Sequence, residues 1–318
     1  MRRVLHVGPC DTPGGMAKVM QILADNPPDG WGAEMVSSHS NSGIIKKINA
    51  WRNVRAFLKV NKKKFDVIHI HSAAGVSYRR KLNLAKLANK LNIPVIIHIH
   101  SGQFDKFAKK RKNIKRELAP FTLAVLTNSW QEKLQPIIGR CSTISNPIDQ
   151  NIRIGDGEKR KSKQLLLLGR ADPVKGHEFA FKIVREIRDK GWELFATGTN
   201  HSEKGITGLG WVSEEDKYKL LQESTALLIP SEFEGQPMVM FEAIKSGCQV
   251  IASQNIEEIP DCIYSAPHDN LQSWIEIINQ IKPIDENNIS ELHSIDFINE
   301  KWAELYSKAI SSHNSSNK

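Results

Sequence analysis

Short apolar runs alternate with longer polar or amphipathic stretches along the whole chain. The runs are nearly continuous, which is typical of strands buried on both faces of a parallel sheet. The stretches between them are long enough for helices. The predicted strands are Val4–Val7, Val67–Ile70, Val95–Ile99, Leu123–Leu126, Leu165–Leu168, Leu194–Ala196, Leu227–Ile229 and Val250–Ala252, and the predicted helices are 44–60, 79–92, 105–118, 176–189, 214–224, 237–246 and 270–281.

This repeated strand-then-helix order predicts an α/β protein whose parallel sheets are covered by helices on both faces. The pattern breaks at Asn151–Lys163, where glycines and basic residues interrupt the apolar positions, so we predict a linker there. A length of 318 residues suits two domains of roughly 150 residues each. We predict Rossmann-like domains over 1–150 and 151–294, followed by an amphipathic helix within 295–318.

Charge divides the chain at the same point. Residues 1–150 hold 25 basic and 9 acidic residues, a balance of +16, and the remainder holds 19 and 26, a balance of −7, within a total of +9. The basic half predicts an anionic partner, such as a lipid headgroup, a phosphorylated acceptor or nucleic acid. No recognised nucleic-acid-binding motif accompanies the charge, so we expect no nucleic-acid partner.

The basic residues gather in two segments, Lys46–Lys64 and Lys106–Arg116, which also contain apolar residues. Each surface Lys or Arg contributes about 1 kcal/mol against anionic lipid. No apolar run approaches the roughly 18 residues of a membrane-spanning helix, and the scattered cysteines indicate reduced thiols rather than disulfides or a zinc site. We therefore predict a cytoplasmic protein held peripherally on the inner face of the membrane. The alternative is that both segments are ordinary solvated helices with an apolar face in the core.

Candidate anion-binding groups follow two of the predicted strands, at the edge where open parallel sheets bind ligands. Gly14-Gly15 follows the first strand, and a glycine pair at a helix start lets backbone N–H groups approach an anion, although a tight turn explains the pair as well. Arg170 and Lys175 follow the strand at Leu165. Two cations and a helix N-terminus would neutralise a diphosphate there, unless both are solvated surface charges.

Two glutamates follow the predicted strand at Leu227–Ile229. Glu234 precedes the next helix, whose first turn suits Pro237, and Glu242 lies inside that helix among apolar residues. A carboxylate buried alone is costly, so Glu242 needs a partner. Two neighbouring ribose hydroxyls would be good hydrogen-bond donors to the Glu242 carboxylate. The alternative is a structural glutamate paired with an arginine.

Two H-x-H pairs, His69/His71 and His98/His100, end the predicted strands at Val67 and Val95. Alternate residues of a strand share a face, so each pair could converge on a metal ion. No acidic or cysteine cluster supports a metal site, so we favour a role for one histidine in a cleft.

Taken together, these motifs resemble the family-4 retaining glycosyltransferases of the GT-B fold. The family's phosphate segment is similar to Gly169-Arg170-x-Asp172-Pro173-x-Lys175-Gly176, and its paired-glutamate motif is similar to Glu234 and Glu242. Weaker matches are Gly14-Gly15, His100-Ser101-Gly102 and Gly210-Trp211-Val212, the last of which resembles the segment that lines the base. The resemblance implies two Rossmann-like domains facing each other across a cleft, with the final helix crossing back to the N-terminal, acceptor-binding domain.

The resemblance also implies a role for each matched residue. Arg170 and Lys175 would hold the donor diphosphate, Glu242 the ribose hydroxyls, and Glu234 the transferred sugar. His100 would lie near the sugar and the leaving group. The predicted catalytic residues are His100, Arg170, Lys175 and Glu234, and the predicted donor-binding residues are Gly14, Gly15, Arg170, Lys175, Val212, Glu234, Gly235, Gln236, Pro237, Met238, Val239 and Glu242.

The predicted mechanism follows from charge, because breaking the anomeric bond leaves negative charge on the nucleotide diphosphate. No two aspartates have the Asp-x-Asp spacing that many transferases use to hold a divalent ion, so we expect neither metal nor cofactor. Family members retain the anomeric configuration, and we favour front-face attack because no protein nucleophile is obvious. We expect a hexosyltransferase of surface polysaccharide or glycolipid biosynthesis that takes UDP-sugars in preference to GDP-sugars and acts on a glycan or lipid-linked acceptor.

Three other functions stay open. A nucleotide-sugar epimerase would share the architecture but need no acceptor. A metal-dependent hydrolase would use the H-x-H pairs and lose activity with a chelator. A sugar-nucleotide binding module would bind the donor without turnover.

Overall fold

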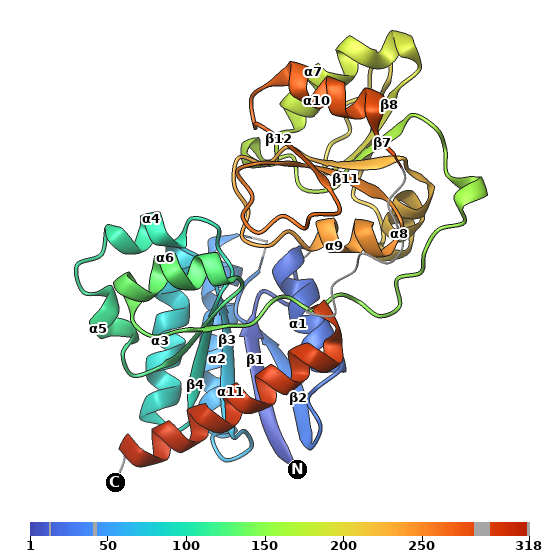
Figure 1. Cartoon of the computed structure of the whole chain (residues 1–318). Coiled ribbons are helices and arrows are strands. Elements are labelled where there is room, and N and C mark those ends of the chain that lie inside the picture. The colour runs from blue at the N-terminus through green and yellow to red at the C-terminus, as the bar shows by residue number, and fades with distance from the viewer. Residues whose placement is uncertain (13, 41–42, 283–292, 317–318) are drawn as a thin grey trace. The chain divides into compact units, whose positions relative to one another are not determined.

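The computed structural model describes residues 1–12, 14–40, 43–282 and 293–316. The chain forms two compact units, Met1–Ile148 with Glu291–Lys318, and Asp149–Ser290 (Figure 1). Each unit holds one six-stranded sheet whose paired strands are all parallel, as the alternation of apolar runs and helices predicted. The sequence placed the divisions after 150 and 294.

The first sheet has the strand order β2-β1-β3-β4-β5-β6. Its strands are β1 (Arg2–Gly8), β2 (Trp31–Ser37), β3 (Val67–Ser72), β4 (Val95–Ile99), β5 (Thr122–Val125) and β6 (Ser142–Thr143), and the helices of this unit are α1 (Gly15–Asp25), α2 (Ile44–Val60), α3 (Val76–Lys90), α4 (Phe104–Lys109), α5 (Ile114–Leu118), α6 (Asn128–Ile138) and α11 (Ile295–Ser316).

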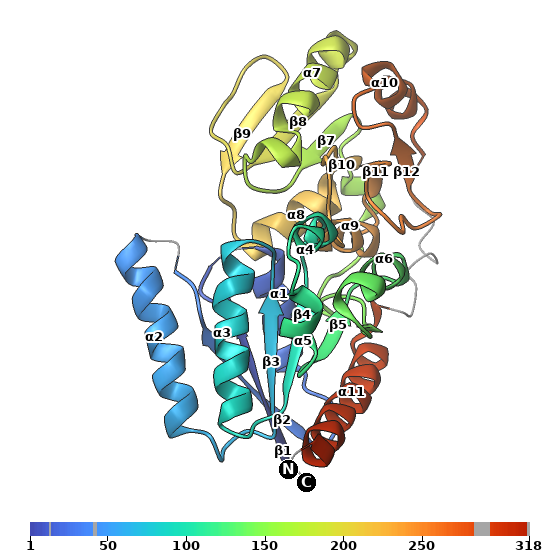
Figure 2. The same cartoon turned by 90° about the vertical axis from the view of Figure 1, so that its left-hand side faces the viewer.

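The two faces of the first sheet differ in chemistry. Alternate residues such as Leu5 and Ile68 join the apolar core under α2 and α3. The intervening residues face α11, whose Trp302 and Tyr306 rings lie 4.3 and 5.9 Å from the His69 ring centroid. Figure 2 shows α3 and α11 on opposite sides of this sheet. The final helix therefore belongs to the first unit and completes its core.

The second sheet has the order β12-β11-β10-β7-β8-β9, with β7 and β10 at its centre. Its strands are β7 (Gln164–Leu167), β8 (Glu193–Thr197), β9 (Ile206–Gly210), β10 (Ala226–Ile229), β11 (Gln249–Ser253) and β12 (Tyr264–Ala266), and the helices of this unit are α7 (His177–Ile187), α8 (Glu214–Glu223), α9 (Met238–Lys245) and α10 (Leu271–Gln280), with 3₁₀ turns at Gly157–Lys159, Pro173–Lys175 and Arg188–Lys190.

The structure differs from the sequence prediction in two respects. The strands β2, β6, β9 and β12 were not predicted, because they are short or mixed in polarity and lie at or near sheet edges. The predicted helix 105–118 is divided into α4 and α5, separated by 110–113. Lys175 lies in a 3₁₀ turn that ends just before α7 begins at His177. No described helix is both long enough and apolar enough to span a membrane.

Candidate functional site

The loop after β7 packs directly over the turn after β8. The Gly169 N–H donates a hydrogen bond to the Thr197 hydroxyl at 2.9 Å. A Cβ atom on Gly198 would lie 2.2 Å from the Gly169 carbonyl oxygen, and Gly198 has a φ of 76°. Glycine is therefore required at position 198 for both its conformation and its packing. This contact fixes the backbone that carries Arg170.

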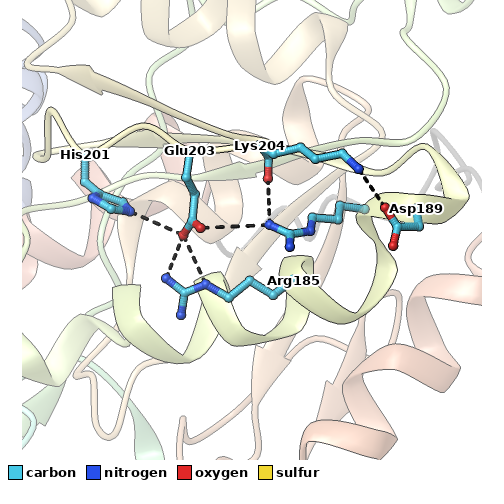
Figure 3. A network of polar contacts seen from close by, with 6 residues as sticks. Arg185, Asp189, His201, Glu203 and Lys204 are labelled. Atoms are coloured by element: carbon cyan, nitrogen blue, oxygen red, sulfur yellow. Dashed lines mark hydrogen bonds and ion pairs between the residues drawn. The ribbon is translucent and has the colours of Figure 1, made fainter.

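A polar network holds the segment after β8 against α7 (Figure 3). Glu203 accepts two hydrogen bonds from Arg185, of 3.0 and 2.6 Å, and lies 3.3 Å from the His201 ring nitrogen. Lys204 donates to Asp189 at 2.9 Å. The hydrogen bonds from Arg185 are the main reason that the pKa of Glu203 is lowered. These groups border solvent, so we assign the network a structural role in anchoring the turn.

The Arg170 side chain is exposed, and its guanidinium makes no hydrogen bond or ion pair with the residues that the structure describes. It follows β7, a central strand, at the edge where parallel sheets bind ligands. A guanidinium without a protein partner can bind an oxyanion without first giving up another contact. The prediction that Arg170 contacts the donor diphosphate is therefore compatible with its surroundings.

Lys175 forms an ion pair with Glu234, which also accepts a hydrogen bond from the Ser231 hydroxyl at 3.1 Å. The backbone N–H of Glu232 donates to the Val174 carbonyl at 2.9 Å, so the loops after β7 and β10 are joined twice. The Lys175 side chain is 29% exposed. Because an ammonium has three donors, Lys175 can keep Glu234 and still contact an anion.

The segment Gly235–Val239 leads from this loop into α9. Pro237 is the N-cap residue and makes no side-chain capping hydrogen bond. The first N–H groups of a helix have no acceptor within the helix, and they carry partial positive charge. Gly235 and Met238 are buried, whereas Gln236 and Val239 are partly exposed. The N-terminus of α9 thus adds backbone donors to the same sheet edge as Arg170.

Glu242 is 1% exposed and is paired with Lys217 of α8. The Lys217 ammonium lies 3.0 Å from one carboxylate oxygen and 2.9 Å from the other. It also reaches Glu214 at 3.0 Å. A protein partner of this kind is what the structural alternative required, although the cation is a lysine and not an arginine. The predicted bond from Glu242 to ribose hydroxyls stays a prediction, and it would have to share the carboxylate with Lys217.

Val212 lies between β9 and α8, next to Trp211, whose side chain is 61% exposed. The helix α8 begins immediately afterwards, where the Ser213 hydroxyl accepts the Asp216 N–H at 3.0 Å. Because α8 also carries Lys217, the segment predicted to line the base and the carboxylate predicted to bind the ribose are linked through one helix.

In the first unit, Gly14 and Gly15 are exposed at the start of α1. A Cβ atom on Gly14 would meet nothing within 4 Å, but its φ is 145°. Backbone conformation, and not packing, therefore favours glycine at position 14. The contact of this glycine pair with phosphate stays a prediction.

Five histidines gather on the α11-facing side of the first sheet. His6 of β1 is in register with His69 of β3, and His71 is in register with His98 of β4. His100 follows β4, and its ring centroid lies 4.0 Å from that of His98. The sequence showed two separate H-x-H pairs, and the sheet register unites them with His6, which sequence reasoning missed.

These imidazoles form hydrogen-bonded chains. His71 contacts His6 at 3.0 Å through Nε2 and His100 at 3.0 Å through Nδ1. His69 contacts His98 at 3.3 Å and the Tyr306 hydroxyl at 3.0 Å. Burial lowers the pKa of all five rings, that of His6 to about 3. The rings are therefore neutral at pH 7, and in each contact one ring donates and the other accepts.

Two overlapping groups of three histidines have ligand atoms within 4.8 Å of one another, His6/His69/His71 and His71/His98/His100. Imidazole nitrogens suit zinc, copper or nickel. An ion at either place would have to replace the hydrogen bonds between the rings. The expectation that this protein needs no metal stays a prediction.

Comparison with known proteins shows that most of the second unit is similar to a recognised family. Residues 162–281 match the family model described as glycosyl transferases group 1. A curated relative, the "uncharacterized 41.2 kDa protein in cps region" of Klebsiella pneumoniae, is 27% identical over 77% of this chain and 73% of its own length.

The fold is that of known GT-B glycosyltransferases. Sucrose-phosphate synthase from Thermosynechococcus elongatus superposes with a TM-score of 0.77 at 15% identity, covering 98% of this chain and 100% of that one. The pneumococcal O-GlcNAc transferase GtfA, solved with UDP and GlcNAc, superposes with a TM-score of 0.59 at 17% identity, covering 81% of this chain and 60% of that one. The family match over 162–281 supports glycosyltransferase activity for the chain.

Proposed function

We propose that the chain is a retaining, metal-independent glycosyltransferase of family 4 that moves a hexosyl group from a UDP-sugar to a glycan or lipid-linked acceptor. One observation carries the proposal. Within the segment that matches the glycosyltransferase family, Arg170, the Lys175–Glu234 pair and the N-terminus of α9 lie at the carboxyl ends of β7 and β10.

Arg170 and Lys175 neutralise the diphosphate as the anomeric bond breaks. A single preorganised donor to developing charge is often worth about 3 kcal/mol of transition-state stabilisation. The α9 N-terminus contributes further donors through Gly235–Val239. These groups supply the positive charge that a divalent ion provides in other transferases.

Lys175 and Ser231 hold Glu234 in place through one carboxylate oxygen. The second oxygen can therefore accept a hydrogen bond from a hydroxyl of the transferred sugar. His100 acts near the sugar and leaving group, as the resemblance implies. The acceptor attacks the front face of the sugar, and its proton passes to the leaving phosphate, so the anomeric configuration is retained. Val212 and Glu242 complete the donor site at the base and the ribose.

The relatives support a polysaccharide pathway. The Klebsiella relative is named for its place in a cps region, and the pneumococcal transferase structure contains UDP. The basic segment at Lys46–Lys64 supports contact with an anionic membrane, because α2 exposes Ile45 by 75% and Ile48 by 43% among its lysines. We propose that the protein works on the cytoplasmic face of the membrane.

The test is a donor screen on the full chain. We expect UDP-sugars to raise the melting temperature more than GDP- or ADP-sugars, because a ligand that binds only the folded state stabilises it by mass action. Arg170→Ala should weaken donor binding at least tenfold without lowering the melting temperature of the ligand-free protein. Lys182→Ala removes another exposed cation of the same unit, on α7, and should bind the donor as the wild type does. Equal binding by the two variants would refute the diphosphate site.

Product analysis separates transfer from its rivals. An epimerase converts the donor without an acceptor, whereas a transferase releases UDP in proportion to glycosylated product. A metal-dependent hydrolase is favoured only by the convergence of the histidine groups, and its activity would disappear with a chelator. Retention is read from the anomeric configuration of the product by NMR.

A further inference from the structure

Basic side chains gather in the first unit where β2 ends and α3 begins. Lys81 lies on α3 and is 2% exposed, and its ammonium donates a hydrogen bond to the Ser38 hydroxyl. The neighbouring Arg80 donates to His39 Nδ1 at 3.0 Å. Ser38 and His39 directly follow β2. The group therefore lies at the carboxyl edge of the first sheet, where parallel α/β sheets bind ligands.

Lys81 lacks the negatively charged partner that a buried ammonium requires. It makes no ion pair with a carboxylate in the described parts of the chain, and Ser38 satisfies one of its three donors. The Ser38 hydroxyl is itself engaged, because it donates to the Gly8 carbonyl at 3.1 Å. The Arg80 Nε is also buried without a hydrogen-bond partner among the described residues. Burying a charge without a counter-charge is costly, so this arrangement points to an anion from outside the chain.

The field around Lys81 is positive from several sides. Burial, followed by the Arg80 charge, lowers the pKa of Lys81 to about 7. Burial and the charges of Arg80, Lys47 and Lys81 lower the pKa of His39. The Cys10 thiol lies on another side, with Asp11 beside it, and its pKa is raised by burial and by Asp11.

The cluster also lies close to the histidine chain, because the Lys81 charge contributes, after burial, to lowering the pKa of His100.

We propose that Lys81, Arg80 and His39, with Ser38 positioning the Lys81 ammonium, form a phosphate-binding subsite that recognises a phosphate group of the acceptor. The assignment to the acceptor rests on the proposed function, whereas the binding of phosphate does not. Phosphate fits better than carboxylate because its second negative charge matches two cations and its extra oxygens can accept a hydrogen bond from the neutral His39 ring as well. Arg80 and His39 are partly exposed, so the anion can approach from solvent beside them.

The test measures binding of glycerol 3-phosphate to the full chain by calorimetry, with no donor present and with glycerol as the uncharged control. Lys81→Met should lower the affinity for glycerol 3-phosphate at least tenfold. Lys90→Met removes an exposed lysine of the same helix and should change the affinity by less than twofold. Equal binding by Lys81→Met and wild type, or no saturable binding by the wild type, would overturn the subsite.

The stability of the ligand-free variant separates a binding role from a structural one. Replacing a buried charge that lacks a counter-charge by an apolar side chain of similar size is neutral or stabilising. We therefore expect Lys81→Met to melt at the same temperature as the wild type or higher, and to lose the upward shift that glycerol 3-phosphate causes. A destabilised Lys81→Met that retains the full shift would show that Lys81 serves only the fold. Arg80→Met, at a partly exposed position, gives an independent measurement of affinity.

Proton uptake gives a second readout. A bound anion should raise the pKa of Lys81, so sulfate binding at pH 8, where sulfate itself does not titrate, should take up protons in the wild type and not in Lys81→Met. Calorimetry in two buffers of different ionisation enthalpy measures this uptake, and equal uptake by both proteins would count against Lys81.

Two vesicle arms distinguish a lipid phosphate from a soluble one. Weaker binding of Lys81→Met to phosphatidic acid vesicles, with phosphatidylcholine as the blank, together with weaker glycerol 3-phosphate binding, indicates a lipid acceptor. Loss of glycerol 3-phosphate binding alone indicates a soluble phosphorylated acceptor. Loss of vesicle binding alone would overturn the subsite. If no donor supports transfer but phosphate still depends on Lys81, the proposed function fails and the subsite stands.

Discussion

The carboxylate of Glu242 and the ammonium of Lys217 form an ion pair of 2.9 Å that joins α9 to α8 in the second unit. Glu242 is 1% exposed and the Lys217 side chain 13% exposed, so the buried Glu242 carboxylate depends on the Lys217 ammonium for its counter-charge. Desolvation opposes the pair, but losing one member leaves an uncompensated buried charge.

Lys217→Met should therefore destabilise the protein by about 3 kcal/mol, measured by urea denaturation, because Glu242 is left buried without its cation. Adding Glu242→Gln to Lys217→Met should recover most of that loss. Lys219→Met removes an exposed lysine of the same helix and should stay within about 0.5 kcal/mol of the wild type. Additive losses in the double variant would show that the two side chains are not coupled.

Glu234→Gln should lower the transfer rate by about 100-fold, because the neutral amide cannot replace a carboxylate aimed at the reacting sugar. Donor affinity should fall by only a few-fold, since Arg170 and Lys175 remain. The comparison is the neighbouring exposed Glu232→Gln, which should keep its rate. Steady-state kinetics with a calorimetric donor titration checks both values, and a rate loss shared equally by the two variants would remove Glu234 from the mechanism.

The buried histidines should make the first unit sensitive to acid. Burial lowers the pKa of His6 to about 3, so between about pH 6.5 and 3 the unfolded chain binds a proton there that the folded chain does not. The free energy of unfolding therefore rises with pH across this window. The contribution of His6 is fully present above the window and is lost as the pH falls through it. Each such histidine adds a slope of up to about 1.4 kcal/mol per pH unit.

Urea midpoints measured from pH 7 to pH 4 should fall steeply for the wild type. His6→Gln should lower the number of protons taken up on unfolding in this range by roughly one and so flatten the dependence on pH. A midpoint that does not change with pH in this range would mean that the imidazoles take up protons in the folded protein as readily as in the unfolded chain.

Metal removal should leave transfer unchanged. We expect the rate after treatment with EDTA to equal the untreated rate, and elemental analysis of the purified protein to find no stoichiometric zinc, because each of the five rings is already hydrogen-bonded to another through at least one nitrogen. Activity that disappears with the chelator and returns with Zn²⁺ would reverse this and favour the hydrolase.

Membrane contact should depend on the apolar residues of α2. Ile45→Ser with Ile48→Ser should reduce sedimentation with phosphatidylglycerol vesicles several-fold, because both side chains are exposed among basic residues. Val76→Ser is the control, since Val76 is 71% exposed at the start of α3. Sedimentation that does not differ between anionic and neutral vesicles would reject the membrane prediction.

The sequence by itself determined the parallel α/β architecture and the positions of Arg170, Lys175 and Glu234 at strand ends. These features are local, because a continuous apolar run followed by glycine and charged residues specifies a strand and the loop beyond it. The edge strands β2, β6, β9 and β12 escaped prediction because their short or mixed patterns carry little of that signal.

Only the tertiary structure decided which distant groups meet. The register of β1, β3 and β4 brings His6 beside the two H-x-H pairs, and no spacing within one strand contains that information. The partner of Glu242 and the lack of a carboxylate for Lys81 among the described residues are likewise set by which helices pack together. The energy of a buried charge depends on its neighbours in space, and the sequence pattern fixes only that the residue is buried.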